Sequence, residues 1–223
     1  MTNRILVIAP HPDDETLGCG GTLLRAIAEG ASVHWAIASA MTEAMGFSAS
    51  RIAQREREIE DVATAYRFDG VHRASFPAAR LDTFPIAARV AWMADVIKAV
   101  QPETLYLPHP HDVHSDHAAV FDAAVACTKA FRYPSVRRVY GYETLSETEF
   151  GLRPGVTPFH PARFVDIAAH LDRKIEIMGL FSGEMGVAPF PRSAETIRAL
   201  ATYRGSVAGT VAAEAFMVLR EII

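Results

Sequence analysis

A continuous apolar run near the amino terminus ends directly in a cluster of reactive side chains. Residues 5–9 read Ile-Leu-Val-Ile-Ala, and after Pro10 the chain continues His11-Pro12-Asp13-Asp14-Glu15. An uninterrupted apolar strand is buried on both faces, which is typical of the parallel sheets of α/β proteins. This feature predicts a central strand that delivers one histidine and three carboxylates to an edge of the sheet.

Strand and helix patterns alternate along the rest of the chain. Apolar runs predict further strands at 32–38, 71–76, 104–107, 138–142, 163–167 and 215–219. Helical spacing predicts helices at 16–29, from residue 50 or 51, at 86–100, 118–130 and 168–181, and from about residue 193. This alternation indicates an α/β fold with a doubly wound, mostly parallel (Rossmann-like) sheet and helices on both faces. The whole chain, 1–223, is expected to form a single domain.

Composition argues against several classes of partner. The net charge is −4 and no run of Lys or Arg marks a basic face, so we expect no nucleic-acid partner. No stretch approaches the ~18–20 apolar residues of a membrane span, and the first residues lack a secretory signal pattern. Cys19 and Cys127 have no CxxC spacing and are interpreted as reduced, buried thiols of a cytoplasmic protein.

A second cluster of reactive side chains follows the predicted strand at 104–107. The segment His109–His117 contains four of the nine histidines and two aspartates. In doubly wound sheets, ligands bind beyond the carboxyl ends of the strands, so the two clusters are expected to meet. A catalytic zinc takes three protein ligands and keeps a position for water. His11, Asp14 and His117 are therefore predicted to form a two-histidine, one-carboxylate zinc site.

The neighbouring side chains suggest hydrolytic chemistry. Zinc lowers the pKa of its water toward about 7, and Asp13 is the candidate general base for that water. His114 is expected to stabilise the oxyanion as an imidazolium, with Asp116 orienting its ring and raising its pKa. The spacing leaves one alternative open, because Asp13 and Asp14 could exchange the roles of base and ligand.

Other motif interpretations account for less of the chain. Gly18-Cys19-Gly20-Gly21 lacks the last glycine of G-x-G-x-x-G, where Leu23 stands, so the glycines are expected to serve close packing of a helix on the sheet. Asp112 breaks the H-x-H-x-D-H signature of metallo-β-lactamase-like hydrolases, which would also leave His11 and Asp14 unexplained. No Ser or Cys stands in a G-x-S-x-G context.

The motifs together resemble the PIG-L/LmbE-like family of zinc-dependent N-acetylglucosaminyl deacetylases. The resemblance rests on Pro10–Glu15 with the glycines that follow, and on Asp112-x-His114-x-Asp116-His117. Weaker similarities are Arg55-Glu56-x-Glu58, Tyr142-Glu143-Thr144, and Phe164–Ile167 before Lys174.

Family membership would imply specific roles. His11, Asp14 and His117 would hold zinc, Asp13 would be the general base, and His114 with Asp116 would assist the oxyanion or the leaving amine. The resemblance thus resolves the choice between Asp13 and Asp14. It also implies a homo-oligomer.

The segments expected to bind substrate depart from the family pattern. Met41-Thr42-Glu43-Ala44 replaces a Thr-x-Gly-Glu/Asp-like stretch, and 76–82 lacks the usual Pro-Asp. By analogy, Arg55 and Asp82 are candidates for contacts to sugar hydroxyl or phosphate groups. Substrate identity is expected to depend on the loops at 39–50, 77–85 and 183–191.

The predicted function is zinc-dependent removal of an N-acetyl group from a GlcNAc-type amino-sugar, either a small molecule or a glycoconjugate. Two alternatives stay open: a zinc hydrolase of another amide or ester, and a non-catalytic metal-binding protein.

Overall fold

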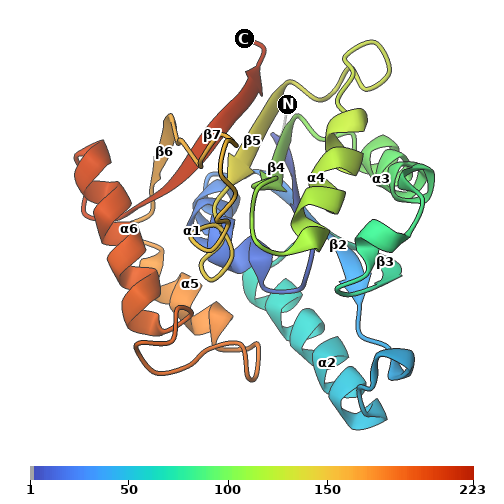
Figure 1. Ribbon diagram of the computed structural model, residues 1–223. Helices are drawn as coiled ribbons and strands as arrows, with labels where there is room; N and C mark the ends of the chain where they lie inside the picture. The colour runs from blue at the N-terminus through green and yellow to red at the C-terminus, as the bar shows by residue number, and fades with distance from the viewer. Residues whose placement is uncertain (1–2) are drawn as a thin grey trace.

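A seven-stranded sheet forms the centre of the protein in the computed structural model, which describes residues 3–223 (Figure 1). In chain order the strands are β1 (Arg4–Ala9), β2 (Ser32–Ala40), β3 (Gly70–Pro77), β4 (Thr104–Pro108), β5 (Arg138–Tyr142), β6 (Arg163–Asp166) and β7 (Ala213–Glu221). Their spatial order is β3-β2-β1-β4-β5-β7-β6. The first five strands pair in parallel, and β7 is antiparallel to both of its neighbours.

Helices pack on both faces of the sheet (Figure 1). They are α1 (Asp14–Ala28), α2 (Ala49–Tyr66), α3 (Ile86–Val100), α4 (Ser115–Ala126), α5 (Leu171–Met178) and α6 (Ala194–Ala208), with short 3₁₀ turns η1 (Glu43–Met45) and η2 (Leu81–Thr83). The predicted doubly wound α/β fold is confirmed. Within residues 3–223, no helix combines the length and the apolar character needed to cross a bilayer.

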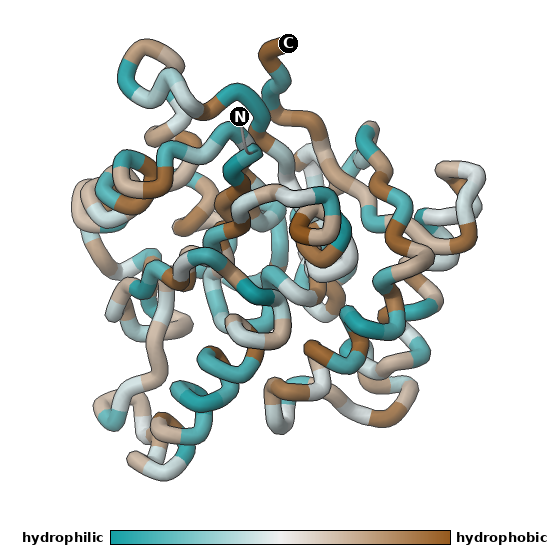
Figure 2. The backbone as a smooth tube through the Cα atoms, turned by 180° about the vertical axis from the view of Figure 1, so that it is seen from behind, coloured by the Kyte–Doolittle hydropathy of each residue, from teal (hydrophilic) through white to brown (hydrophobic). Residues whose placement is uncertain are grey.

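The central strand β1 is buried on both of its faces. Ile5 and Val7 join a core cluster with residues of α1, α2, α5 and α6, whereas Leu6 and Ile8 join a second cluster with residues of α3 and α4. This alternation is the two-residue period of a strand inside a two-sided sheet. Seen from behind, α2 is mainly hydrophilic (Figure 2).

Glycines in α1 permit its close approach to the sheet. A Cβ atom at Gly18 would lie 2.3 Å from Cδ2 of Tyr142 in β5, and one at Gly21 would lie 2.7 Å from Cβ of Ile167. Contacts this short do not occur between real side chains, so no larger residue fits without movement. The packing role predicted for these glycines is confirmed.

A buried ion pair also holds α1 in place. Lys174 of α5 lies 2.7 Å from Glu214 of β7 and donates to the Leu17 carbonyl. Glu214 accepts hydrogen bonds from the backbone N–H groups of Gly21 and Thr22. The pair therefore joins three elements behind the start of α1, and backbone partners offset the cost of burying its two charges.

Two helices differ clearly from their predicted ranges. The helix expected at 118–130 begins at Ser115, because Nδ1 of His114 accepts a hydrogen bond from the Asp116 N–H and caps the helix. The helix expected at 168–181 is shorter, Leu171–Met178. The earlier start of α4 places His117 in its first turn, facing the end of β1.

Candidate active site

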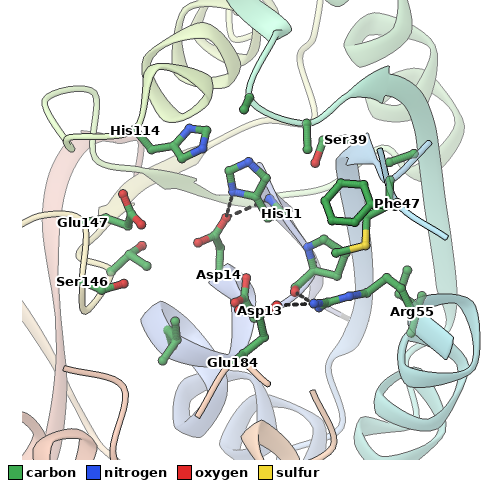
Figure 3. A pocket seen from close by; sticks show the side chains of 18 of the residues that line it. His11, Asp13, Asp14, Ser39, Phe47, Arg55, His114, Ser146, Glu147 and Glu184 are labelled. Atoms are coloured by element: carbon green, nitrogen blue, oxygen red, sulfur yellow. Dashed lines mark hydrogen bonds and ion pairs between the residues drawn. The ribbon is translucent and has the colours of Figure 1, made fainter. Parts of the chain in front are cut away.

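The two reactive clusters meet at the carboxyl ends of β1 and β4. These strands are neighbours in the sheet, with Ile5 opposite Thr104 and Val7 opposite Tyr106. The chain leaves β1 toward β2 on one side, while β4 lies on the other, so this edge is a topological switch point. Figure 3 shows His11, Asp13 and Asp14 at the centre of a cavity there.

Three side chains converge in the way predicted for a metal site. Oδ2 of Asp14 lies 3.4 Å from Nδ1 of His11 and 3.5 Å from Nε2 of His117. Donors about 2.0–2.2 Å from one tetrahedral ion are separated by about 3.3–3.6 Å, so these spacings fit a single metal ion. Asp14 and His117 are buried and His11 is partly exposed.

Each imidazole is oriented by a carboxylate on its far nitrogen. Nε2 of His11 lies 3.0 Å from Oδ2 of Asp116, which leaves Nδ1 toward Asp14. Nδ1 of His117 lies 2.7 Å from Oδ2 of Asp112, which leaves Nε2 toward Asp14. Such carboxylate–histidine pairs are typical of metal-binding imidazoles because they set the tautomer and ring direction.

The protonation behaviour of these groups also suits a cation. Burial opposes the charged forms of His11 and His117, but their carboxylate neighbours outweigh it, raising the pKa of His11 to about 9 and that of His117 well above its usual range. Burial likewise opposes ionisation of Asp14, yet the charges of the nearby His117 and His11 lower its pKa. Nε2 of His117 is buried without a hydrogen-bond partner among the described residues. The residues therefore fit a divalent ion, which could replace these protons.

Asp13 lies beside this donor set but faces another partner. Its φ of 141° is unusual for a residue other than glycine, and its side chain lies 3.0 Å from Arg192. Burial, together with the charges of Asp14 and Glu184, raises the pKa of Asp13 to about 8. The Asp13 N–H donates to the Glu15 carboxylate at 3.1 Å, so Glu15 braces the start of the helix.

A network of arginines and acids surrounds Asp13. Arg192, in the loop before α6, also lies 3.1 Å from Glu184, and Glu184 pairs with Arg55 of α2. Arg55 donates to the Pro12 carbonyl at 3.0 Å. The Arg55 guanidinium therefore holds the loop that carries Asp13, and its side chain is buried rather than solvated.

The relation between His114 and Asp116 differs from the one expected. Asp116 accepts hydrogen bonds from the N–H groups of Ala79 and Leu81 and from His11, while its carboxylate lies 4.0 Å from Nδ1 of His114. Burial and the neighbouring His11 lower the pKa of His114 instead of raising it. Because Nδ1 accepts from the backbone, neutral His114 carries its proton on Nε2.

The cavity beside these residues has a volume of about 270 Å³. Arg55 and His114 line it, but Asp82 is exposed in η2 and does not. Figure 3 shows Phe47 and Arg55 on one side of the cavity, and Ser146 and Glu147 on the other.

Sequence reasoning assigned no role to several residues of the site. Glu184 lies in the loop 183–191, which was expected to bind substrate, and Arg192 follows directly after it. Both are too far from Asp13 in the sequence for any local motif to connect them with it. Asp112 belongs to the motif Asp112-x-His114-x-Asp116-His117, and its position five residues before His117 could have suggested its role. Glu143 is held by two hydrogen bonds from Arg204, so it braces the structure.

Fold and site together define an α/β protein with a buried histidine–aspartate donor set at its strand ends. Residues 6–128 match the model of the PIG-L family, described as GlcNAc-PI de-N-acetylase. The chain belongs to this family.

Its relatives include named deacetylases. It is 28% identical over 246 residues to 1D-myo-inositol 2-acetamido-2-deoxy-alpha-D-glucopyranoside deacetylase of Rhodococcus opacus (strain B4), covering 83% of each chain. The conserved protein TT1542 from Thermus thermophilus has a TM-score of 0.78 at 28% identity, covering 100% of this chain and 97% of that one. N,N'-diacetylchitobiose deacetylase from Pyrococcus horikoshii has the same fold, with a TM-score of 0.78 at 19% identity and coverage of 98% and 84%.

Proposed function

We propose that this protein is a zinc-dependent N-deacetylase that releases acetate from an amino-sugar of the N-acetylglucosamine type. The proposal rests on the donor set His11, Asp14 and His117, which lies beside the buried Asp13. The carboxylates of Asp116 and Asp112 orient the two imidazoles of this set. Membership of the PIG-L family and the named activity of the Rhodococcus relative support the substrate class.

The donor set favours zinc among the divalent metals. Two imidazoles and one carboxylate are the ligand type of catalytic zinc sites in hydrolases. A zinc ion at these donors would supply Lewis acidity, which polarises an amide carbonyl and makes water more acidic. The carboxylates of Asp112 and Asp116 would keep both rings in the ligating orientation.

The remaining groups are placed for amide hydrolysis. Asp13 would accept a proton from the attacking water and return it to the departing amine, because its buried carboxyl group lies beside the donor set. Neutral His114 would donate from Nε2 to the oxyanion as the carbonyl carbon becomes tetrahedral. The products are acetate and the free amine. Because Asp82 lies outside the cavity, we leave it out of the proposed site.

The proposal is tested by metal analysis and acetate release with the purified protein. We expect about one zinc per chain, and acetate release from N-acetylated sugars in preference to N-acetylated amino acids and acetyl esters. Preference for the amino acids or esters would favour a different hydrolase. Bound zinc with no hydrolysis of any substrate would indicate a non-catalytic metal-binding protein.

A variant of the base separates binding from catalysis. Asp13→Asn keeps the side-chain volume and a residue type that tolerates positive φ, so the zinc content should stay unchanged. Without the carboxylate, kcat should fall at least about 100-fold. A near-normal kcat in this variant would show that Asp13 is not the base.

A further inference from the structure

One wall of the cavity is apolar. Met41, Met45 and Phe47 line it from the segment between β2 and α2, and all three are partly buried. Leu17 and Ile59 continue this surface from α1 and α2. Unbranched methionines adapt to ligands of irregular shape, and an aromatic ring offers a flat apolar face. This wall is suited to an apolar group rather than to a hydroxyl-rich one.

The arginines of the cavity are already paired with carboxylates. Arg73 lies 2.5 Å from Glu56, Arg192 lies 3.0 Å from Asp13, and Arg55 pairs with Glu58 and Glu184. The lining contains five carboxyl groups and three guanidinium groups, so the groups that could bind an anion are outnumbered. An anionic substrate would therefore find no uncompensated positive side chain here.

The wall opposite Phe47 is acidic and polar (Figure 3). The Glu147 carboxylate lines the cavity and makes no ion pair within residues 3–223, and Thr144 and Ser146 lie beside it. A carboxylate can accept hydrogen bonds from sugar hydroxyl groups. The cavity thus presents hydrogen-bond acceptors on one side and an apolar surface on the other.

We infer that the preferred substrate is uncharged and carries an apolar group that packs on the wall formed by Met41, Met45 and Phe47. This inference rests on the proposed function, since it concerns the substrate of the same site. The apolar group belongs either to the aglycone or to an acyl chain longer than acetyl, and the two sources share the same chemistry. A preference for the longer acyl chain would make the same site an N-deacylase that also accepts acetyl.

Four substrates that share the same sugar ring separate the effects of the aglycone, the acyl chain and the charge. They are methyl N-acetylglucosaminide, its hexyl glycoside, N-acetylglucosamine 1-phosphate, and the methyl glycoside with N-hexanoyl in place of N-acetyl. Amine release is measured with the zinc-loaded protein, because it reports all four reactions. We expect kcat/KM for the hexyl or the N-hexanoyl substrate to exceed that of the methyl glycoside by about tenfold or more. The phosphate should be the poorest substrate.

Phe47→Ala tests whether the apolar wall causes this preference. The ratio of kcat/KM for the preferred apolar substrate to that for the methyl glycoside should fall about tenfold. Phe131→Ala is the matched control, because Phe131 is 79% exposed and does not line the cavity. An unchanged ratio in Phe47→Ala would overturn the inference.

Glu56→Gln tests the discrimination against anions. It leaves Arg73 without its partner in the cavity, so kcat/KM for the phosphate relative to the methyl glycoside should rise about fivefold or more. Glu60→Gln removes an exposed charge from the same helix and is the control.

The outcomes distinguish this inference from the proposed function. Amine release from all four substrates at similar rates, or a preference for the phosphate, overturns the inference and leaves the deacetylase function standing. Absence of amine release from every substrate overturns the proposed function, and the inference with it.

Discussion

Asp112 orients the imidazole of His117, one of the proposed metal ligands. It accepts from Nδ1 of His117 at 2.7 Å and from the Thr148 hydroxyl at 2.7 Å, so both of its oxygens are used. The side chains of Asp112 and His117 are fully buried, so this bond is shielded from bulk solvent. The direction of Nε2 toward Asp14 therefore depends on this one carboxylate.

Removing Asp112 should weaken metal binding. Asp112→Ala frees the His117 ring to rotate, and we expect zinc affinity to fall about 10–100-fold. Competition with a chelating dye measures the change. Asp122→Ala removes a carboxylate from the exposed side of α4, the helix that carries His117, and should leave affinity unaltered. Equal affinities in the two variants would contradict an orienting role for Asp112.

At the scale of elements, the site depends on how closely α1 approaches the sheet. Asp14 is the first residue of α1, and Gly18 lies one turn later against Tyr142. The Tyr142 hydroxyl donates to the Ile8 carbonyl at 2.8 Å, so its ring has little freedom to move. A larger residue at position 18 must therefore displace the helix that carries Asp14.

Gly18→Ala should destabilise the protein by about 1–3 kcal/mol, as overpacking of a core does. Alanine is the better helix former, so a loss of stability would isolate the steric effect. Urea denaturation measures the change, with Gly141→Ala as the control, because a Cβ there meets nothing closer than 3.6 Å. A Gly18→Ala variant as stable as the parent would show that the contact relaxes at no cost.

At the scale of the whole molecule, the carboxyl edge of the sheet gathers acidic groups that a cation would neutralise. Asp13, Asp14, Glu15, Asp112 and Asp116 are all 5% exposed or less. The charges of Asp14, Asp112 and Asp116 raise the pKa values of the two histidines and favour a bound cation. Metal binding should consequently contribute to the stability of the fold.

Zinc should raise the melting temperature of the apoprotein. A ligand at about 100 times its Kd stabilises the native state by about 2.7 kcal/mol, which corresponds to about 5–10 °C for a chain of this size. Calorimetry before and after treatment with EDTA, followed by zinc, measures the shift and its reversal. No shift at zinc concentrations that fill the site would indicate a site of equal affinity in native and unfolded chains.

Local patterns were sufficient to predict the fold class and the position of the donor set. The strand at 4–9 follows from its unbroken apolar residues. Parallel strands bring the segments that follow them to the same edge of the sheet, independently of the conformation of the loops. His11, Asp14 and His117 could be placed together for this reason. Helix ends were less predictable, because α4 begins at a histidine cap that propensity does not favour.

Only the tertiary structure decided which partners these residues take. Asp116 lies two residues from His114, yet it hydrogen-bonds His11, which is 105 residues away. Arg192 reaches Asp13 across 179 residues. Such pairings depend on how the loops pack, and loops have no residue periodicity from which their packing could be predicted. The opening segment His11–Glu15 by itself determined that side chains of the metal-ligand type would lie at a strand end. The direction of each ring and carboxylate, and the apolar wall facing them, arose from segments that meet only in the folded chain.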